Sequence, residues 1–163
     1  MTVEISDSRL TNSLAQGCGE ILKGVRSGGL LRGLSLGDAG DEAAQEWIAR
    51  VLAQHRPQDG MLSEEATDTP DRLGKKRVWI IDPLDGTTNF IHGLPQFAIS
   101  IAVRRHGVLE HAVVFDPSRN ELFCASRGSG AYLNERRIRV SRLDRLSDAL
   151  IGTGFPFRQG QDL

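Results

Sequence analysis

The residues best suited to chemistry lie in the stretch VWIIDPLDGTTNF, where an apolar segment runs directly into two aspartates. Asp82 and Asp85 are three positions apart, and Pro83 between them stiffens the backbone. Two carboxylates held this close repel each other, so one tends to stay protonated unless a cation is bound. A hard divalent cation such as Mg²⁺ relieves the repulsion and prefers oxygen ligands. Taken alone, however, DPLDG is more typical of a turn than of a metal site.

The residues beside the two aspartates could add to such a site. The backbone carbonyl of Leu84 lies between the aspartates and could serve as a further oxygen ligand. Gly86 lets the backbone approach a ligand closely. The hydroxyls of Thr87 and Thr88 follow directly and are near enough to orient a water molecule.

A second acidic pair, Glu64 and Glu65, ends the short predicted strand MLSEE. If this strand neighbours RVWIID, Glu64 and Asp82 emerge at the same edge of the sheet, and three or four carboxylates converge. Asp41, near the predicted start of the second helix, is a third contributor, although its position is also typical of a helix N-cap. Together these groups favour a metal-assisted hydrolase over a set of unrelated turns.

The elements that position these groups are predicted from hydrophobic periodicity. Helical spacing predicts a first helix from Arg9 to about Val25 and a second from near Asp41, joined by the glycine-rich stretch GGLLRGLSLGDAG. The period then changes to two, which predicts a series of strands. These are MLSEE, RVWIID, QFAISIAVR, VLEHAVVFD, ELFCASR and RRIRVS. We therefore predict an α+β fold, with two N-terminal helices packed on an antiparallel β-meander.

Composition and charge bound the class of protein. The 163 residues include 20 Lys and Arg and 21 Asp and Glu, so no basic excess indicates nucleic-acid binding. The basic cluster between Arg136 and Arg142 is interpreted as a solvated strand edge. With no apolar stretch of membrane-spanning length and no secretory signal, we expect a cytoplasmic protein. Cys18 and Cys124 match no metal pattern and are expected to be reduced, partly buried thiols. The four histidines are interpreted as surface or turn residues: His55, His92, His106 and His111.

On these motifs the chain resembles the inositol monophosphatase family of Mg²⁺-dependent, lithium-sensitive phosphatases. The likeness is carried by WIIDPLDGTTNF, by the SEE upstream and by the strand meander downstream, and it extends from the first helix to GTGFPF. It implies that the metal ligands are Glu64, Asp82, the Leu84 carbonyl and Asp85. The fold it implies is the N-terminal half of the sugar phosphatase αβαβα fold. Residues 1–145 would form the helix and sheet domain, and residues 146–163 the start of a truncated second α/β domain whose first strand includes LSDALIGTGFP.

The resemblance also implies roles in binding and catalysis. Gly86 and Thr87, with Thr88 beside them, would contact the substrate phosphate. Asp41 would pair with Thr87 to orient the attacking water. The sequence departs from the family in lacking the later WDxAAG-type motif, whose aspartate completes the second metal site, and in offering only Arg32 where a lysine is common.

Three functions are open from the sequence. The leading hypothesis is a Mg²⁺-dependent phosphomonoesterase that acts on inositol monophosphate or a related small phosphate ester. The N-terminal third, LGDAGDEAAQEWI onward, looks more like the 3′-phosphoadenosine 5′-phosphate phosphatase branch, which favours a 3′(2′),5′-bisphosphate nucleotidase. The third is a catalytically inactive metal-binding fragment, in which apolar surface around Phe97, Ile99 and Phe155 favours a homodimer. The expected partner is otherwise a small phosphorylated substrate, without nucleic acid or membrane.

Overall fold

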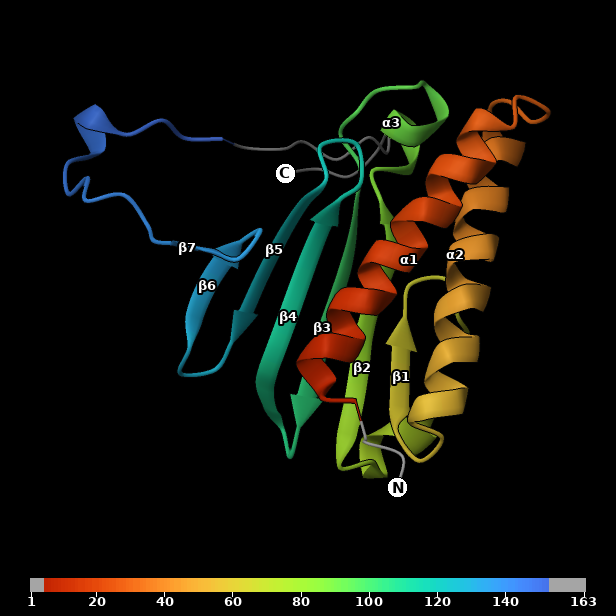
Figure 1. The fold of residues 1–163 in the computed structure, drawn as a ribbon, viewed down its shortest axis with the longest axis horizontal. Helices are drawn as coiled ribbons and strands as arrows, with labels where there is room; N and C mark the ends of the chain where they lie inside the picture. Colours follow the sequence, from red (N-terminus) through yellow and green to blue (C-terminus); the bar gives the residue numbers. More distant parts are fainter. Residues whose placement is uncertain (1–4, 153–163) are drawn as a thin grey trace, which may run out of the picture.

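The computed structural model describes residues 5–152 as two long helices side by side on one face of a seven-stranded sheet (Figure 1). The helices are α1 (Asp7–Ser27) and α2 (Leu34–His55). A short helix, α3 (Thr87–Ile91), follows β2, and two 3₁₀ turns are η1 (Pro70–Gly74) and η2 (Leu146–Asp148). The strands lie in chain order across the sheet: β1 (Gly60–Ser63), β2 (Arg77–Asp85), β3 (Ala98–Arg105), β4 (Val108–Asp116), β5 (Glu121–Ser126), β6 (Gly130–Leu133) and β7 (Arg136–Ile138).

The sheet is an antiparallel meander from β2 to β7, as predicted, but β1 runs parallel to β2. The predicted neighbourhood of the first two strands is confirmed, because Ser63 pairs with Ile81. The expectation of a wholly antiparallel sheet was wrong. The connection over residues 64–76 includes η1 and returns the chain to the starting end of β1, so that both strands leave the sheet at the same edge.

The second helix begins earlier than predicted, at Leu34, so half of the presumed glycine-rich link is helical. Gly37 and Gly40 lie where α2 meets other elements, and an added Cβ would come within 3.0 Å of Ile91 and Phe90 respectively. These glycines therefore permit close packing and do not interrupt the helix. Asp41 consequently lies inside α2, and the N-cap interpretation of this residue was wrong.

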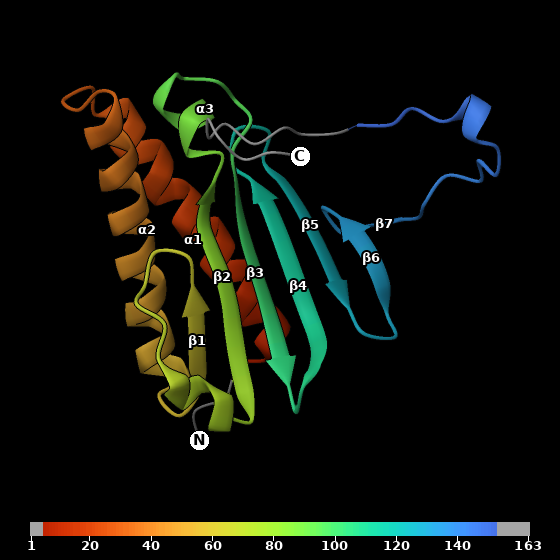
Figure 2. The same cartoon turned by 180° about the vertical axis from the view of Figure 1, so that it is seen from behind.

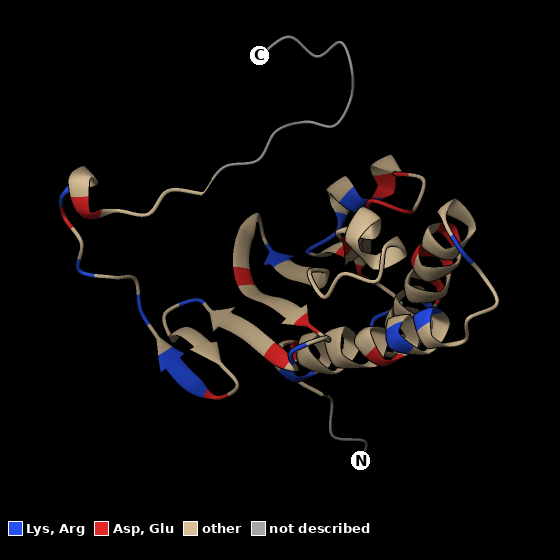
Figure 3. Cartoon of the chain, turned by 90° about the horizontal axis from the view of Figure 1, so that it is seen from above, with Lys and Arg blue, Asp and Glu red and all other residues tan. Residues whose placement is uncertain are grey.

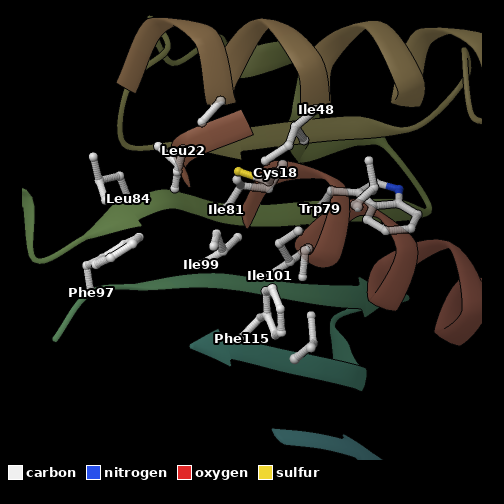
Figure 4. Close-up of a cluster of buried hydrophobic side chains, with 14 of the residues drawn as sticks. Cys18, Leu22, Ile48, Trp79, Ile81, Leu84, Phe97, Ile99, Ile101 and Phe115 are labelled. Atoms are coloured by element: carbon white, nitrogen blue, oxygen red, sulfur yellow. The ribbon is translucent and has the colours of Figure 1, made fainter. Parts of the chain in front are cut away.

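The core fills the space between the two helices and the sheet (Figure 4). From α1, Leu10, Leu14, Cys18 and Leu22 recur every four residues and form one buried stripe. Alternate residues of β2, β3 and β4 face this stripe, among them Ile99, which is 0% exposed. Phe97, just before β3, joins the same core and is 3% exposed. The prediction of exposed apolar surface around these two residues was therefore wrong, while Phe155 lies outside the described residues.

The opposite face of the sheet carries no helix among the described residues (Figure 2). Two large apolar side chains on this open face, Val114 and Phe123, are 43% and 36% exposed. After β7 the chain leaves the sheet as an extended arm over residues 139–152, which includes η2. The described part of the predicted strand LSDALIGTGFP contains no strand. The described helices include none that is long and apolar enough to cross a membrane.

Candidate metal and phosphate site

A bulge at the end of β2 brings its two aspartates to the same face of the sheet. Asp82 lies opposite Ser100 and Asp85 opposite Ala98, so three steps along β2 correspond to two along β3. Residues three apart in a regular strand point to opposite faces, and the extra residue cancels this alternation. Without the bulge, the three-residue spacing in DPLDG would place the two carboxylates on opposite faces. With it, both can serve one site.

The turn after the bulge is fixed by short local contacts. The Leu84 N–H donates to Asp82 Oδ1 at 3.2 Å, and the Thr87 hydroxyl donates to the Leu84 carbonyl at 3.1 Å. Gly86 has a φ of +92°, and an added Cβ would lie 2.8 Å from the Gln96 carbonyl oxygen. Only glycine fits this position without strain. The sequence did not predict that the following TTNFI would form α3.

Asp41 and Asp82 carry the electrostatic signature of a shared acidic site. Burial raises the pKa of Asp41 from 3.8 to about 7. Repulsion from nearby carboxylates adds to the rise, in decreasing order from Glu65, Asp82, Glu64 and Asp38. Burial likewise raises the pKa of Asp82 from 3.8 to about 6, followed by repulsion from Glu64 and Asp85. Figure 3 looks down on this end of the molecule, with its acidic residues in red. The local surplus of negative charge and oxygen donors suits a hard cation.

The carboxylates are divided between two hollows at the end of β1. Glu64 and Asp82 line a hollow on the open face of the sheet, together with Ser100. Asp41 and Glu65 line a second hollow beside α2. Among residues 5–152, no three His, Cys, Asp or Glu side chains are arranged to hold a metal ion as they stand. The predicted carboxylates thus lie within electrostatic reach of one another without forming a closed ligand set.

Thr87 lies on the side of the site that faces α2. An added Cβ at Gly37 would lie 3.0 Å from Thr87 Cγ2, so the threonine methyl group packs against this glycine. Gly37 and Asp41 are four residues apart on α2 and therefore share a helix face. Thr88, by contrast, is exposed at the outer side of α3.

Two contacts that support the site were not foreseen from the sequence. The Cys18 thiol donates to the Pro83 carbonyl at 3.6 Å, and burial raises the pKa of Cys18 to about 12, so it stays protonated as a donor. The Ser63 hydroxyl donates to Gln45 Oε1 at 2.6 Å and ties the end of β1, just before Glu64, to α2. Both contacts join residues far apart in the chain, and no local motif announces them.

The other sequence interpretations fare unevenly. Both cysteines are free, with Cys18 buried and Cys124 partly buried, as predicted. Arg136 and Arg137 of the edge strand β7 are exposed, which confirms the solvated edge. Three histidines are exposed, but His111 is buried, so its interpretation as a surface residue was wrong. Its ring nitrogens lie 2.7 Å from Ser126 Oγ and 3.3 Å from Asn12 Oδ1, which fastens α1 to the sheet.

The chain matches the inositol monophosphatase family over residues 9–163. It belongs to this family. The chain is 53% identical over 122 residues to the Nus factor SuhB of Pseudomonas aeruginosa, covering 74% of this chain and 45% of that protein. It is 52% identical over 116 residues to the inositol-1-monophosphatase of Rhizobium meliloti, covering 71% and 43%. The crystal structure of the extragenic suppressor protein suhB from Bartonella henselae matches with a TM-score of 0.79 and 40% identity, covering 93% of this chain and 60% of that one.

These comparisons confirm the predicted family and the α+β architecture. The chain spans about half the length of the curated relatives it matches.

Proposed function

We propose that the end of β2 and the start of α3 form part of a Mg²⁺-dependent phosphatase site that hydrolyses inositol monophosphate or a related small phosphate ester. The observation that carries the proposal is the convergence of three carboxylates: Glu64 and Asp82 line one hollow, and the bulge in β2 brings Asp85 to the same face of the sheet as Asp82. Burial, followed by repulsion from Glu64 and Asp85, raises the pKa of Asp82. Membership of the inositol monophosphatase family supports the reaction class. The name of the Rhizobium meliloti relative supports the substrate class.

Each site residue has a role in this proposal. Glu64, Asp82 and Asp85 would hold Mg²⁺ through their carboxylates, and Leu84 through its backbone carbonyl. When bound, Mg²⁺ lowers the pKa of a water molecule and neutralises phosphate charge. The bulge in β2 keeps two of these carboxylates on one face, as the ligand set requires.

The remaining residues would handle the phosphate and the water. Gly86, Thr87 and Thr88 would contact the substrate phosphate, because the left-handed turn at Gly86 leaves the backbone open to close approach. The Thr87 hydroxyl donates to the Leu84 carbonyl and keeps its lone pairs free to accept from the attacking water. Asp41, on the same face of α2 as the glycine that Thr87 contacts, would act with it as the general base.

Phosphate release measures this function directly. The chain would be assayed with inositol monophosphate and with 3′-phosphoadenosine 5′-phosphate, each with Mg²⁺ and with a chelator. Asp85→Asn should reduce Mg²⁺-dependent release by more than about 100-fold, the upper range for residues that support a metal site. Asp144→Asn, at an exposed aspartate of the arm, is the matched control and should leave release unchanged.

Each result of this assay selects one function. Preference for the nucleotide would favour the bisphosphate nucleotidase. Release that persists without Mg²⁺, or that survives Asp85→Asn, would refute the proposed mechanism. A folded chain that releases no phosphate from either substrate would favour the inactive metal-binding fragment.

A second candidate function is that of a Nus factor, the name that one of the relatives carries. The Pseudomonas aeruginosa protein named a Nus factor and the Rhizobium meliloti protein named an inositol monophosphatase are 53% and 52% identical to this chain, so identity supports both names equally.

We keep a cytoplasmic location in the proposal, which the two free thiols suit. The net charge of −1 provides little attraction for nucleic acid, and filter binding to RNA and DNA tests that expectation.

A further inference from the structure

The segment over residues 86–97, which carries the proposed phosphate-binding turn, depends on contacts from outside itself. Its helix, α3, has five residues, too few to be stable alone. Within the segment, the Phe90 N–H donates to the Gly86 carbonyl at 2.9 Å, and Asn89 Nδ2 donates to the Gln96 carbonyl at 2.7 Å. These bonds close the loop on itself but do not attach it to the rest of the protein.

Arg26, in the last turn of α1, provides such an attachment. Its guanidinium carbon lies 4.7 Å from the ring centroid of Phe97 and 5.6 Å from that of Phe90. The same side chain donates from Nη1 to the Leu94 carbonyl at 3.3 Å. Figure 1 shows α3 beside this end of α1. One side chain thus contacts the helix, the loop and the return to β3.

The two aromatic rings connect Arg26 to Gly86. Phe90 and Phe97 pack edge to face with centroids 5.3 Å apart, and both are buried. An added Cβ at Gly86 would lie 3.3 Å from Phe97 Cα, so the left-handed turn rests directly against the backbone of the residue that carries the second ring. A displacement of Phe97 would therefore reach the turn. The planar guanidinium suits this place, because it stacks on aromatic faces and donates a hydrogen bond at the same time.

We propose that Arg26 is a positioning residue for the turn from Gly86 to Thr88, an inference that rests on the proposed phosphate-binding function of that turn. A basic residue in the last turn of α1 also interacts favourably with the helix dipole. That effect would act on α1 alone, whereas positioning acts on residues 86–97. The dipole effect and the positioning effect are distinguished by measuring which segments of the chain lose protection when Arg26 is replaced.

Amide hydrogen exchange of the whole 163-residue chain makes this measurement. Arg26→Met keeps the apolar stem but removes the charge and the hydrogen bond. We expect exchange at Phe90, His92 and Leu94 to accelerate by about three- to tenfold, while β3 and β4 stay unchanged. Arg26→Lys, which keeps a cation over the rings, should recover part of the protection. Arg50→Met, which removes a guanidinium 5.6 Å from the Trp47 ring on α2, is the matched control and should not affect this segment.

Either of two results would overturn the inference. Unchanged exchange over residues 86–97 in Arg26→Met would mean that Arg26 does not hold the segment. Faster exchange spread equally over the segment, β3 and β4 would mean a general contribution to stability.

A second arm of the experiment tests the proposed function separately. Inorganic phosphate with Mg²⁺ should slow exchange over residues 86–97 in the wild type and in Arg26→Met, and exchange in the variant should stay faster than in the wild type at each phosphate concentration. If phosphate has no effect on the wild type while Arg26→Met still loosens the segment, Arg26 holds the turn but the turn does not bind phosphate. In that case the proposed function fails and the contact to the segment stands.

Discussion

Replacing Asp82 by asparagine should make the metal-free chain more stable at neutral pH, although it removes a proposed metal ligand. The pKa of Asp82 is raised to about 6 by burial and by repulsion from Glu64 and Asp85, so the folded state disfavours its charged form. Asparagine is uncharged, and its side-chain oxygen can still accept from the Leu84 N–H, as Asp82 Oδ1 does at 3.2 Å. The substitution therefore removes the repulsion and keeps the local geometry.

The size of the effect follows from the raised pKa. Each pKa unit corresponds to about 1.4 kcal/mol, so a rise from 3.8 to about 6 limits the gain to about 3 kcal/mol. Because Asp82 is only half-buried, solvent screening reduces the expected gain to about 1–1.5 kcal/mol. A carboxyl with a raised folded pKa contributes stability that is fully present below its unfolded pKa and is lost as the pH rises through the folded value. The advantage of Asp82→Asn should therefore vanish near pH 3.8 and be complete above about pH 6.

Urea unfolding followed by circular dichroism, at pH 7 and at pH 4 with a chelator, measures this difference. Asp144→Asn is the control, and at this exposed position the free energy of unfolding should change by less than about 0.5 kcal/mol. Saturation with Mg²⁺ at about 100 times its Kd should stabilise the wild type by about 2.7 kcal/mol and the variant much less. A variant that is less stable than the wild type at pH 7 without metal would refute the reasoning, as would an equal gain at both pH values.

Three further predictions concern the turn, the buried histidine and the open face. Gly86→Ala should lower the free energy of unfolding by about 1–3 kcal/mol, because its φ is +92° and the new Cβ would clash with the Gln96 carbonyl oxygen. Gly93→Ala is the control: its φ is +73° but the space around it is open, so the free energy of unfolding should fall by less. Thermal unfolding of both variants measures the difference. Burial lowers the pKa of His111, so stability should fall as the pH drops below the ordinary value of 6.5, and His111→Gln should show a smaller fall in the urea midpoint between pH 7 and pH 5. We expect the chain to dimerise through the open face, so Val114→Lys should lower the dimer fraction in sedimentation velocity; an unchanged fraction would exclude that face.

The positions of the strands could be predicted from the alternation of their side chains. The direction of β1, parallel to β2, could not be predicted in this way. Periodicity identifies a strand but carries no information on the path of the chain between strands. The segment over residues 64–76 decides that path, and its turn η1 has no periodic pattern. Gly37 and Gly40 misled for a related reason, since glycine marks both a flexible link and a close helix contact. Only the packing partner distinguishes the two.

The candidate site residues were easier to predict from the sequence than the contacts that support them. The residues from Asp82 to Thr88 are contiguous, and residue type and spacing together predicted what they could bind. The contacts that hold them span long stretches of chain, as between Cys18 and Pro83 or between Arg26 and Phe97. Such contacts depend on how α1 lies across the sheet, and no local pattern contains that information.

The acidic site and the core of the protein share one strand, which links function to stability. In β2, Trp79, Ile81 and Leu84 are 0%, 4% and 3% exposed, and Asp82 lies among them. The strand that carries Asp82 and Asp85 is therefore also anchored firmly in the core, so these two carboxylates cannot separate without disturbing the packing beneath them. Relief has to come from a bound cation or a proton. On the proposed function, Mg²⁺ would therefore stabilise the fold as well as neutralise the charge of the phosphate. Removal of Mg²⁺ would destabilise the end of β2 first.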